Sequence, residues 1–347
     1  AMRAAMAVAL AGKQVALLCP TTVLAMQHLR TFKLRFSEFD VSIAMLSRLQ
    51  SQAEAKRIKK EVAAGKIDIL IGTHALLGRS LRFKNLGLVV ADEEHRFGVK
   101  QKEKLRELSQ NNPEFPAEYL AMSATPIPRT LHMALSGIRD VSVIATPPPG
   151  RRAVRTMTLR RSESKIQQQI QREMRRGGQV FFVHNRVQTL PSIAQKIQEL
   201  VPEASIRMAH GQMEKRDLEA TMLSFLRHET HILVCTSIIE NGVDMPNVNT
   251  IIIDNAHMLG LSQLYQLRGR VGRSDVRGHC TLLIPEGGLT REAAMRLNTL
   301  QRFTELGSGF AIARSDLELR GSGNLLGKEQ SGYIDAIGLE TYIDLLE

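Results

Sequence analysis

The chain has 347 residues, of which 43% are hydrophobic and 23% are charged, and it carries 46 Lys and Arg against 35 Asp and Glu. This composition excludes a disordered or fibrous protein, and the length predicts two domains. No run of about 18 apolar residues is present, so we expect no membrane span and no membrane partner. The net charge of +11 favours an anionic partner such as nucleic acid, with a basic surface that has no partner as the alternative.

Short apolar runs alternate with segments of helical period, a pattern that predicts α/β folds with parallel sheets. The strands predicted in the first half are residues 14–19, 41–46, 67–72, 86–91, 119–123 and 141–144. The helices predicted between them include residues 21–36, 51–64 and 100–109. Three prolines and a glycine at 147–150 cannot continue a helix or a central strand, so we place a domain boundary there.

The pattern then restarts, with strands predicted at residues 153–158, 179–183, 205–209, 232–236, 250–253 and 280–284. A helix is predicted over 290–305 with Thr290 as its N-cap, and seven glycines between 307 and 338 predict a shaped loop after it. The predicted domains are therefore residues 1–148, 149–286 and 287–347.

The cysteines, Cys19, Cys235 and Cys280, are far apart and have no metal-binding spacing. Each lies in or beside an apolar run, which predicts buried reduced thiols and a cytoplasmic location. Aromatic residues make up only 4% of the chain, which weakly favours contact with phosphate backbones over base stacking.

The sharpest local signal is an apolar strand followed by Asp92, Glu93, Glu94 and His95. Ligands of open α/β sheets bind beyond the carboxyl ends of the strands, and acids placed there can hold Mg²⁺. Hydrolysis of a nucleoside triphosphate needs one acid for the metal and another to orient the attacking water. Asp92 fits the first role, with Mg²⁺ held through water, and Glu93 fits the second. A plain acidic loop is the alternative.

Residues 266–273 read Gln-Leu-Arg-Gly-Arg-Val-Gly-Arg. Guanidinium groups suit the charge on a transferring phosphoryl group, which makes Arg270 and Arg273 catalytic candidates. A basic loop that binds nucleic acid is the alternative. Because the arginines lie in the second predicted domain and the acids in the first, the sequence predicts a composite site that nucleotide closes and hydrolysis opens.

Two weaker motifs also follow predicted strands. Ser123 and Thr125 offer small hydroxyl groups near the acids, although a helix cap followed by proline explains them equally well. Residues 236–244 offer a hydroxyl, a glycine and an acid at another strand end.

The order, spacing and domain placement of these four motifs resemble superfamily-2 helicases and translocases. The resemblance implies an α/β fold with two RecA-like parallel-sheet lobes in tandem, and ATP and Mg²⁺ as cofactors. It also implies roles for residues at matching positions: DNA binding by Thr21, Thr22, Thr73 and Thr236, nucleotide binding by Gly242, Asp244 and Gln266, and coupling by His95, Ser123 and Thr125.

Residues 95–98, 124–131 and 316–332 narrow the resemblance to the branch of the RecG helicases and the transcription-repair coupling factors. Residues 316–332 resemble this branch's translocation motif, a hairpin and loop in which Arg320 and Gln330 match coupling positions. Three details favour the coupling factors over RecG: the acidic motif 92–95, residues 144–148 and residues 335–347.

This resemblance implies an ATP-dependent motor on double-stranded DNA that acts on stalled RNA polymerase in DNA repair. RNA polymerase and nucleotide-excision-repair proteins would then bind through regions absent from this chain. A RecG-like helicase that remodels replication forks and a non-catalytic DNA-binding module are the alternatives. DNA binding would be largely electrostatic, so we expect the affinity to fall steeply with salt.

One element of the family is missing. None of the Gly-Lys pairs at 12–13, 65–66 and 327–328 completes the P-loop pattern G-x-x-x-x-G-K-[ST]. In the family, the P-loop and its strand lie immediately upstream of the helix that opens this chain. We therefore expect an N-terminally truncated first lobe that is less stable alone, and little or no ATP hydrolysis by this chain.

Overall fold

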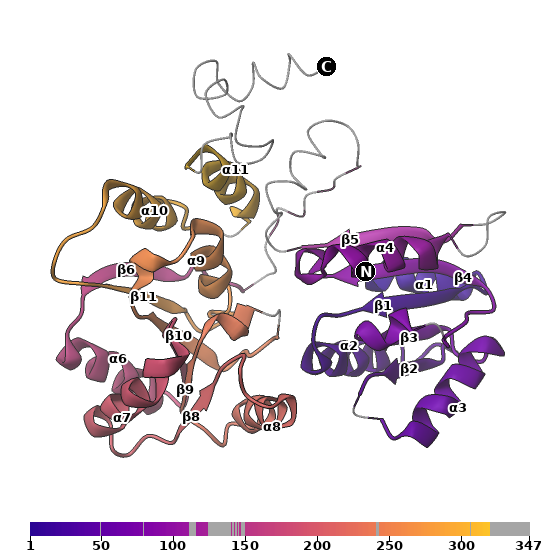
Figure 1. The fold of residues 1–347 in the computed structure, drawn as a ribbon, viewed down its shortest axis with the longest axis horizontal. Coiled ribbons are helices and arrows are strands. Elements are labelled where there is room, and N and C mark those ends of the chain that lie inside the picture. Colours follow the sequence, from indigo (N-terminus) through magenta and orange to yellow (C-terminus); the bar gives the residue numbers. More distant parts are fainter. Residues whose placement is uncertain are drawn as a thin grey trace, which may run out of the picture. The chain divides into compact units, whose positions relative to one another are not determined.

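The computed structural model describes residues 1–48, 50–78, 80–110, 116–123, 150–240, 243–305 and 307–319, together with 140, 142, 144 and 146. This part of the chain forms two compact units, each built on a parallel sheet (Figure 1). The prediction of two RecA-like α/β lobes is confirmed. The predicted boundary at 147–150 stays a prediction, and most of the predicted strand 141–144 lies outside the described residues.

The first unit alternates strands and helices in the predicted order. Its elements are α1 (Met2–Leu10), β1 (Gln14–Leu18), α2 (Thr22–Arg35), β2 (Ile43–Leu46), α3 (Gln52–Ala63), β3 (Ile69–Gly72), β4 (Leu86–Asp92), α4 (Val99–Ser109) and β5 (Glu118–Met122). The strand order is β2-β3-β1-β4-β5, and every pairing is parallel.

The sheet of the first unit is covered on both faces. Along β3, Ile69 and Ile71 pack with residues of α1 and α2, whereas Leu70 packs with residues of α3 and α4. This alternation follows from the two-residue period of a strand, and burial on both faces explains why the strands read as continuous apolar runs.

The second unit has six parallel strands in the order β6-β11-β10-β7-β9-β8. Its first part holds β6 (Arg155–Arg160), α6 (Glu163–Arg175), β7 (Gln179–Val183), α7 (Leu190–Leu200), β8 (Ile206–Ala209), α8 (Lys215–Leu226) and β9 (Ile232–Cys235). Its second part holds β10 (Val248–Ile253), α9 (Leu261–Arg268), β11 (His279–Ile284), α10 (Arg291–Arg302) and α11 (Gly309–Leu319).

The region after α10 departs from the sequence prediction. Thr290 is the predicted N-cap of α10, since its Oγ1 accepts a hydrogen bond of 3.2 Å from the Ala293 N–H. Gly307, with φ of +90°, also lies in the predicted break. The prediction of a loop across Gly309 was wrong, because α11 begins there. The penalty of about 1 kcal/mol for glycine applies to a helix interior, whereas Gly309 is the first residue of α11, and the helix buries Ile312 and Ala313.

Both central strands begin with a buried glutamine that joins distant segments. Gln14 Nε2 donates to the carbonyls of Val62 and Ile67 at 2.9 and 2.8 Å, across the end of α3. Gln179 in the second unit donates to two carbonyls across the end of α8, at 2.9 and 2.7 Å. In both units, therefore, a buried glutamine that donates to two carbonyl groups holds the beginning of a central strand.

All three cysteines are buried free thiols, as predicted. Burial raises the pKa of each thiol, that of Cys280 to about 12, and the carboxylate of Asp92 adds to the effect on Cys19. In the part of the chain that the structure describes, no helix has the length and apolarity needed to cross a membrane.

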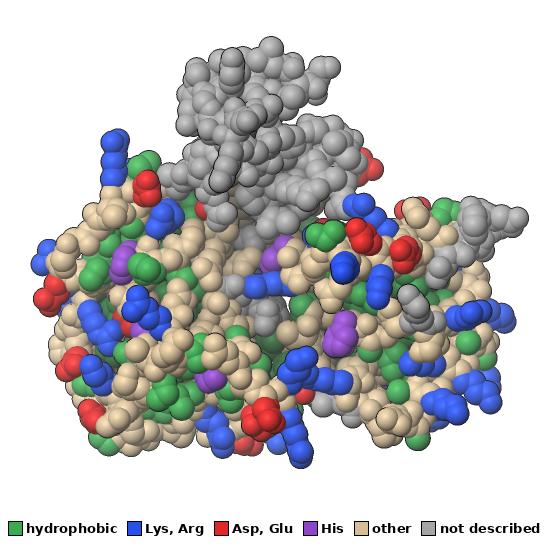
Figure 2. All heavy atoms as spheres, viewed as in Figure 1, with side chains coloured by type: hydrophobic (Ala, Val, Ile, Leu, Met, Phe, Trp, Pro, Cys, Tyr) green, Lys and Arg blue, Asp and Glu red, His purple; other side chains and the backbone are tan. Residues whose placement is uncertain are grey.

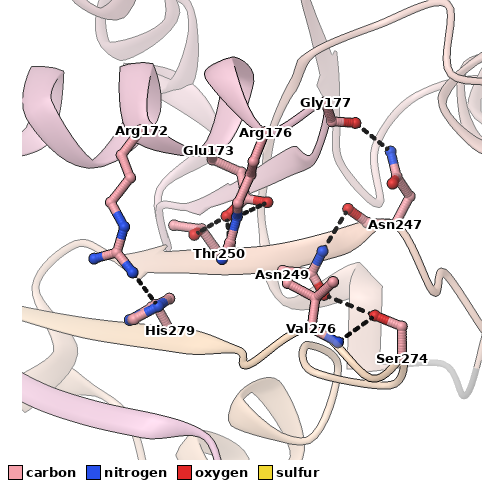
Figure 3. A network of polar contacts seen from close by, with 10 residues as sticks. All are labelled: Arg172, Glu173, Arg176, Gly177, Asn247, Asn249, Thr250, Ser274, Val276 and His279. Carbon is pink, nitrogen blue, oxygen red and sulfur yellow. Dashed lines mark hydrogen bonds and ion pairs between the residues drawn. The ribbon is translucent and has the colours of Figure 1, made fainter.

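A polar network lies where the strands of the second sheet begin (Figure 3). Glu173, only 1% exposed, accepts hydrogen bonds from the Thr250 hydroxyl and from two nitrogens of Arg176, one of them at 3.0 Å. Arg172 lies 2.6 Å from Nε2 of His279, measured from its Nη2 atom. This contact requires the imidazole nitrogen to accept, because a guanidinium can only donate.

His279 is expected to make the stability of the second unit depend on pH. Burial and then the charges of nearby arginines (Arg172, Arg176, Arg155 and Arg277) lower the pKa of His279 from 6.5 to about 4. Between these values the unfolded chain binds more protons, so stability is expected to fall as the pH falls through this window. His279→Gln keeps an acceptor for Arg172 but cannot titrate, and urea midpoints measured from pH 7 to pH 4 should depend less on pH. An unchanged pH dependence would contradict the assignment.

Candidate functional site

The predicted site residues of the first unit follow the ends of parallel strands. Thr73 follows β3, Asp92 ends β4 and Ser123 follows β5. Because the strands are parallel, these ends lie at one edge of the sheet, the edge at which open α/β sheets bind ligands. The structure therefore brings residues from separate motifs to the same edge.

Glu93 has a backbone conformation that is uncommon for a residue with a side chain. Its φ of 52° and ψ of 49° lie in the left-handed region, and its N–H donates to Oδ1 of Asp92 at 3.0 Å. A conformation of this kind costs on the order of 1 kcal/mol and persists where the surroundings enforce it, often at active sites. The turn leaves Glu93 only 6% exposed beside Asp92.

His95 joins the acidic turn to the neighbouring strand. Its Nδ1 lies 3.1 Å from Oγ of Ser123 and 3.5 Å from Oε2 of Glu93. His95 therefore contacts both the acidic turn and the residue that follows β5. Thr125, the other hydroxyl of this motif, lies outside the described residues.

Sequence reasoning missed His28 on α2. Its Nε2 lies 2.7 Å from Oδ2 of Asp92, and its ring packs edge-on against Phe32. The only signal in the sequence was a histidine within a predicted helix. Asp92 is thus held on one oxygen by the N–H of Glu93 and on the other by His28, and its side chain remains 19% exposed.

The residues present fit a magnesium ion that is bound mainly by water and phosphate. Among the described residues, no group of three or more His, Cys, Asp or Glu side chains could hold a metal directly. Mg²⁺ commonly keeps several waters and takes only one or two carboxylates. The partly exposed Asp92 carboxylate suits such a site.

The predicted DNA-contact residues are largely enclosed. Thr21 is the N-cap of α2, and its Oγ1 accepts from the Leu24 N–H at 3.3 Å. Thr22, Thr73 and Thr236 are 5%, 3% and 9% exposed. Thr21, which is half-buried, is therefore more accessible to a ligand than the other three threonines.

The arginine motif of the second unit spans the end of α9 and the turn after it. Gln266 lies on α9, and Arg270 is 4% exposed. Arg273 Nη1 lies 2.9 Å from Oδ1 of Asp244, and its Nε donates to the carbonyl of Gly269 at 3.2 Å. Two predicted site residues from separate motifs are thus in contact, whereas Gly242 lies outside the described residues.

Gly272 gives this turn its shape. Its φ is +66°, and a Cβ atom there would lie 3.2 Å from the backbone of Gly278. Only glycine fits both the conformation and the close approach without strain. The glycine therefore fixes the path of the chain between Arg270 and Arg273.

Arg268, the first arginine of the motif, has a structural contact. It is 5% exposed, its Nη1 donates to the Leu300 carbonyl of α10 at 2.7 Å, and its guanidinium lies 5.1 Å from the centre of the Tyr265 ring. Burial lowers the pKa of Arg268. This arginine holds α9 to α10.

A second polar cluster lies at the strand ends of this unit and was missed by sequence reasoning. Asp254, after β10, accepts from Nη1 of Arg161 at 2.6 Å and contacts Nδ1 of His184 at 2.8 Å. Burial raises the pKa of Asp254, but the His184 hydrogen bond and the Arg161 charge outweigh it, so the pKa is lowered. Nε2 of His184 lies 2.7 Å from Oγ1 of Thr189, which fixes the segment after β7.

Two family models match the chain. The DEAD/DEAH box helicase family matches residues 1–134, and the helicase conserved C-terminal domain matches residues 162–275. The first match spans the whole sheet of the first unit, and the second spans β7 to β10 of the second unit without β6 and β11. Each match includes one set of predicted site residues.

Curated relatives match the whole chain. A transcription-repair-coupling factor of Myxococcus xanthus is 53% identical over 348 residues, and one of Staphylococcus epidermidis is 50% identical over the same length. The chain spans 29% of the length of each of these relatives.

A solved structure of RecG bound to a three-way DNA junction has a TM-score of 0.78 and 35% identity, covering 96% of this chain and 43% of that one. A structure of Saccharomyces cerevisiae Dbp5 bound to RNA shares only 14% identity at a TM-score of 0.61, and it supports the fold alone. The chain thus belongs to the helicases with two RecA-like lobes, and it corresponds to the helicase region of the transcription-repair-coupling factors.

Proposed function

We propose that this chain is the motor region of a transcription-repair-coupling factor, which uses ATP to move on double-stranded DNA and acts on stalled RNA polymerase. The observation that carries the proposal is the acidic turn, in which Asp92, Glu93, His95 and Ser123 form one contacting group at the strand ends. Relatives that share half of the sequence over the whole chain support the same reading.

The first unit supplies the hydrolytic groups. Asp92 would hold Mg²⁺ through water, and the bound ion would offset negative charge on the phosphates. Glu93 orients the attacking water and takes up its proton. The left-handed turn keeps the Glu93 carboxylate beside Asp92. A change at the Glu93 carboxylate would be transmitted through His95 to Ser123 and then to Thr125.

The second unit supplies cations and nucleotide contacts. Arg270 and Arg273 neutralise charge on the transferring phosphoryl group. Asp244 holds Arg273 in position at 2.9 Å, and Gln266 and Gly242 contact the nucleotide. Since the chain carries no P-loop, we propose that it hydrolyses ATP poorly or not at all.

We propose that the protein moves along duplex DNA. Thr21, Thr22, Thr73 and Thr236 would contact phosphates of the DNA backbone. Residues 1–150 hold 21 basic against 13 acidic side chains, and blue basic side chains predominate over the first unit on the face shown in Figure 2. Arg320 and Gln330, outside the described residues, would couple ATP turnover to movement.

RNA polymerase and nucleotide-excision-repair proteins would bind through parts of a longer protein. The RecG structure, which holds a three-way DNA junction, favours fork remodelling as a second candidate function.

The decisive experiment compares ATP hydrolysis by this chain and by a form extended upstream to include a P-loop, each with and without duplex DNA. We expect turnover only from the extended form, with stimulation by duplex DNA. If neither form hydrolyses ATP while both bind DNA, the chain is a non-catalytic binding module. Stronger stimulation by branched than by linear duplex DNA would favour the RecG-like function.

A further inference from the structure

The segment that leads into β6 packs against the arginine turn of the second unit. Val154 is 7% exposed. Its Cγ2 lies 3.2 Å from the position that a Cβ atom added to Gly272 would occupy. The Arg155 N–H donates to the Gly278 carbonyl at 2.9 Å. Residues 151–155 therefore lie beside the turn that carries Arg270 and Arg273.

Arg151, at the start of this segment, is half-buried, and its Nε is enclosed. Within the described ranges, no hydrogen-bond acceptor contacts this nitrogen. Burial lowers the pKa of Arg151, the charge of Arg273 lowers it further, and Tyr265 and Asp244 act in the opposite direction. Arg151 thus lies in the same electrostatic environment as the arginine motif.

The guanidinium groups of Arg151 and Arg273 lie close enough for their charges to interact, and Nη1 of Arg273 lies 2.9 Å from Oδ1 of Asp244. A buried donor without an acceptor is unfavourable, and so is one guanidinium placed near another. A single anion bound beside Arg151 and Arg273 relieves both costs.

We propose that Arg151 is a phosphate-binding residue, which donates to a phosphate oxyanion of the nucleotide held by Arg270 and Arg273. This inference rests on the proposed ATPase function. A phosphate suits the cluster because its oxygens can accept from two guanidinium groups at once. The enclosed Nε favours a small anion over the backbone of a duplex, which exposed side chains can reach.

Arg151→Met tests the proposal, because methionine keeps an aliphatic stem and removes the charge. In the extended form with a P-loop, Mg·ATP affinity is measured by calorimetry and stability by urea unfolding. We expect the Kd for Mg·ATP to rise about tenfold, which corresponds to about 1.4 kcal/mol. The urea midpoint without nucleotide should not fall, since the variant removes a desolvated cation. Arg151→Lys should recover part of the affinity.

Arg152→Met is the matched control, because Arg152 is the exposed neighbour on the same segment. It should leave the Kd for Mg·ATP unchanged. An unchanged Kd in Arg151→Met, a lowered urea midpoint with unchanged Kd, or an equal effect of both variants would each overturn the proposal. A loss of duplex DNA affinity without a loss of ATP affinity would assign the anion to DNA instead. Failure of the unsubstituted form to bind Mg·ATP would reject the proposed function itself.

Discussion

Replacing Glu93 with glutamine is expected to abolish most ATP turnover, by a factor of about 10²–10⁴, in a form of the protein that includes a P-loop. Glutamine keeps the size of the side chain but cannot accept the proton of the attacking water. The side chain is enclosed beside Asp92 and His95, so bulk water cannot easily replace it. Steady-state phosphate release with saturating duplex DNA measures the effect.

Glu118→Gln is a suitable control for this variant. Glu118 is exposed and begins β5, so it lies at the other edge of the same sheet, and its replacement should leave turnover unchanged. Nucleotide binding by Glu93→Gln should persist, because the substitution leaves Asp92 and the arginines in place. Retained turnover in Glu93→Gln would remove Glu93 from the mechanism.

Replacing Glu173 with alanine is expected to lower the free energy of unfolding of the second unit by about 3 kcal/mol. The carboxylate is 1% exposed and accepts from Arg176 and from the Thr250 hydroxyl. Alanine leaves both donors without their acceptor, although the Arg176 side chain, 27% exposed, can turn to water. The substitution also leaves a gap beside Gly178, because the Glu173 carboxylate occupies the space that a Cβ atom on Gly178 would fill.

Urea unfolding followed by circular dichroism measures this loss. Glu163→Ala, on the exposed start of the same helix α6, should change stability by no more than about 0.5 kcal/mol. Glu173→Gln should lie between the two, because its amide oxygen can still accept from Thr250. Equal stability of Glu173→Ala and Glu163→Ala would show that the buried network adds little.

The sequence predicted the strands well because a strand covered on both faces is a continuous apolar run. The strand predicted over 179–183 matches β7, and most other described strands match to within two residues. The prediction for β10 began at Thr250 and missed Val248 and Asn249, because the polar Asn249 interrupts the apolar run. The burial of Asn249 depends on partners elsewhere, such as the Ser274 hydroxyl, which donates to its Oδ1 at 3.3 Å and which no local pattern reveals.

The candidate site was predictable only where its residues lie together in the sequence. The acids that follow β4 and the arginines that follow α9 stand in compact motifs, so their chemistry could be inferred. The roles of His28 and Arg151 depend on residues that lie far away in the chain. His28 contacts Asp92, and Arg151 interacts with the charge of Arg273. Contacts of this kind arise from folding, and a single sequence carries no direct signal for them.

The hydrogen bond from the Ser262 hydroxyl to Oδ2 of Asp316, 2.7 Å long, joins the first turn of α9 to α11. The opposite end of α9 carries the arginine turn. A rigid helix of eight residues is about 12 Å long, so a tilt of α9 by a few degrees about its middle would displace both ends in opposite directions. A displacement of the arginine turn would therefore reach α11 through α9 and the Ser262–Asp316 hydrogen bond.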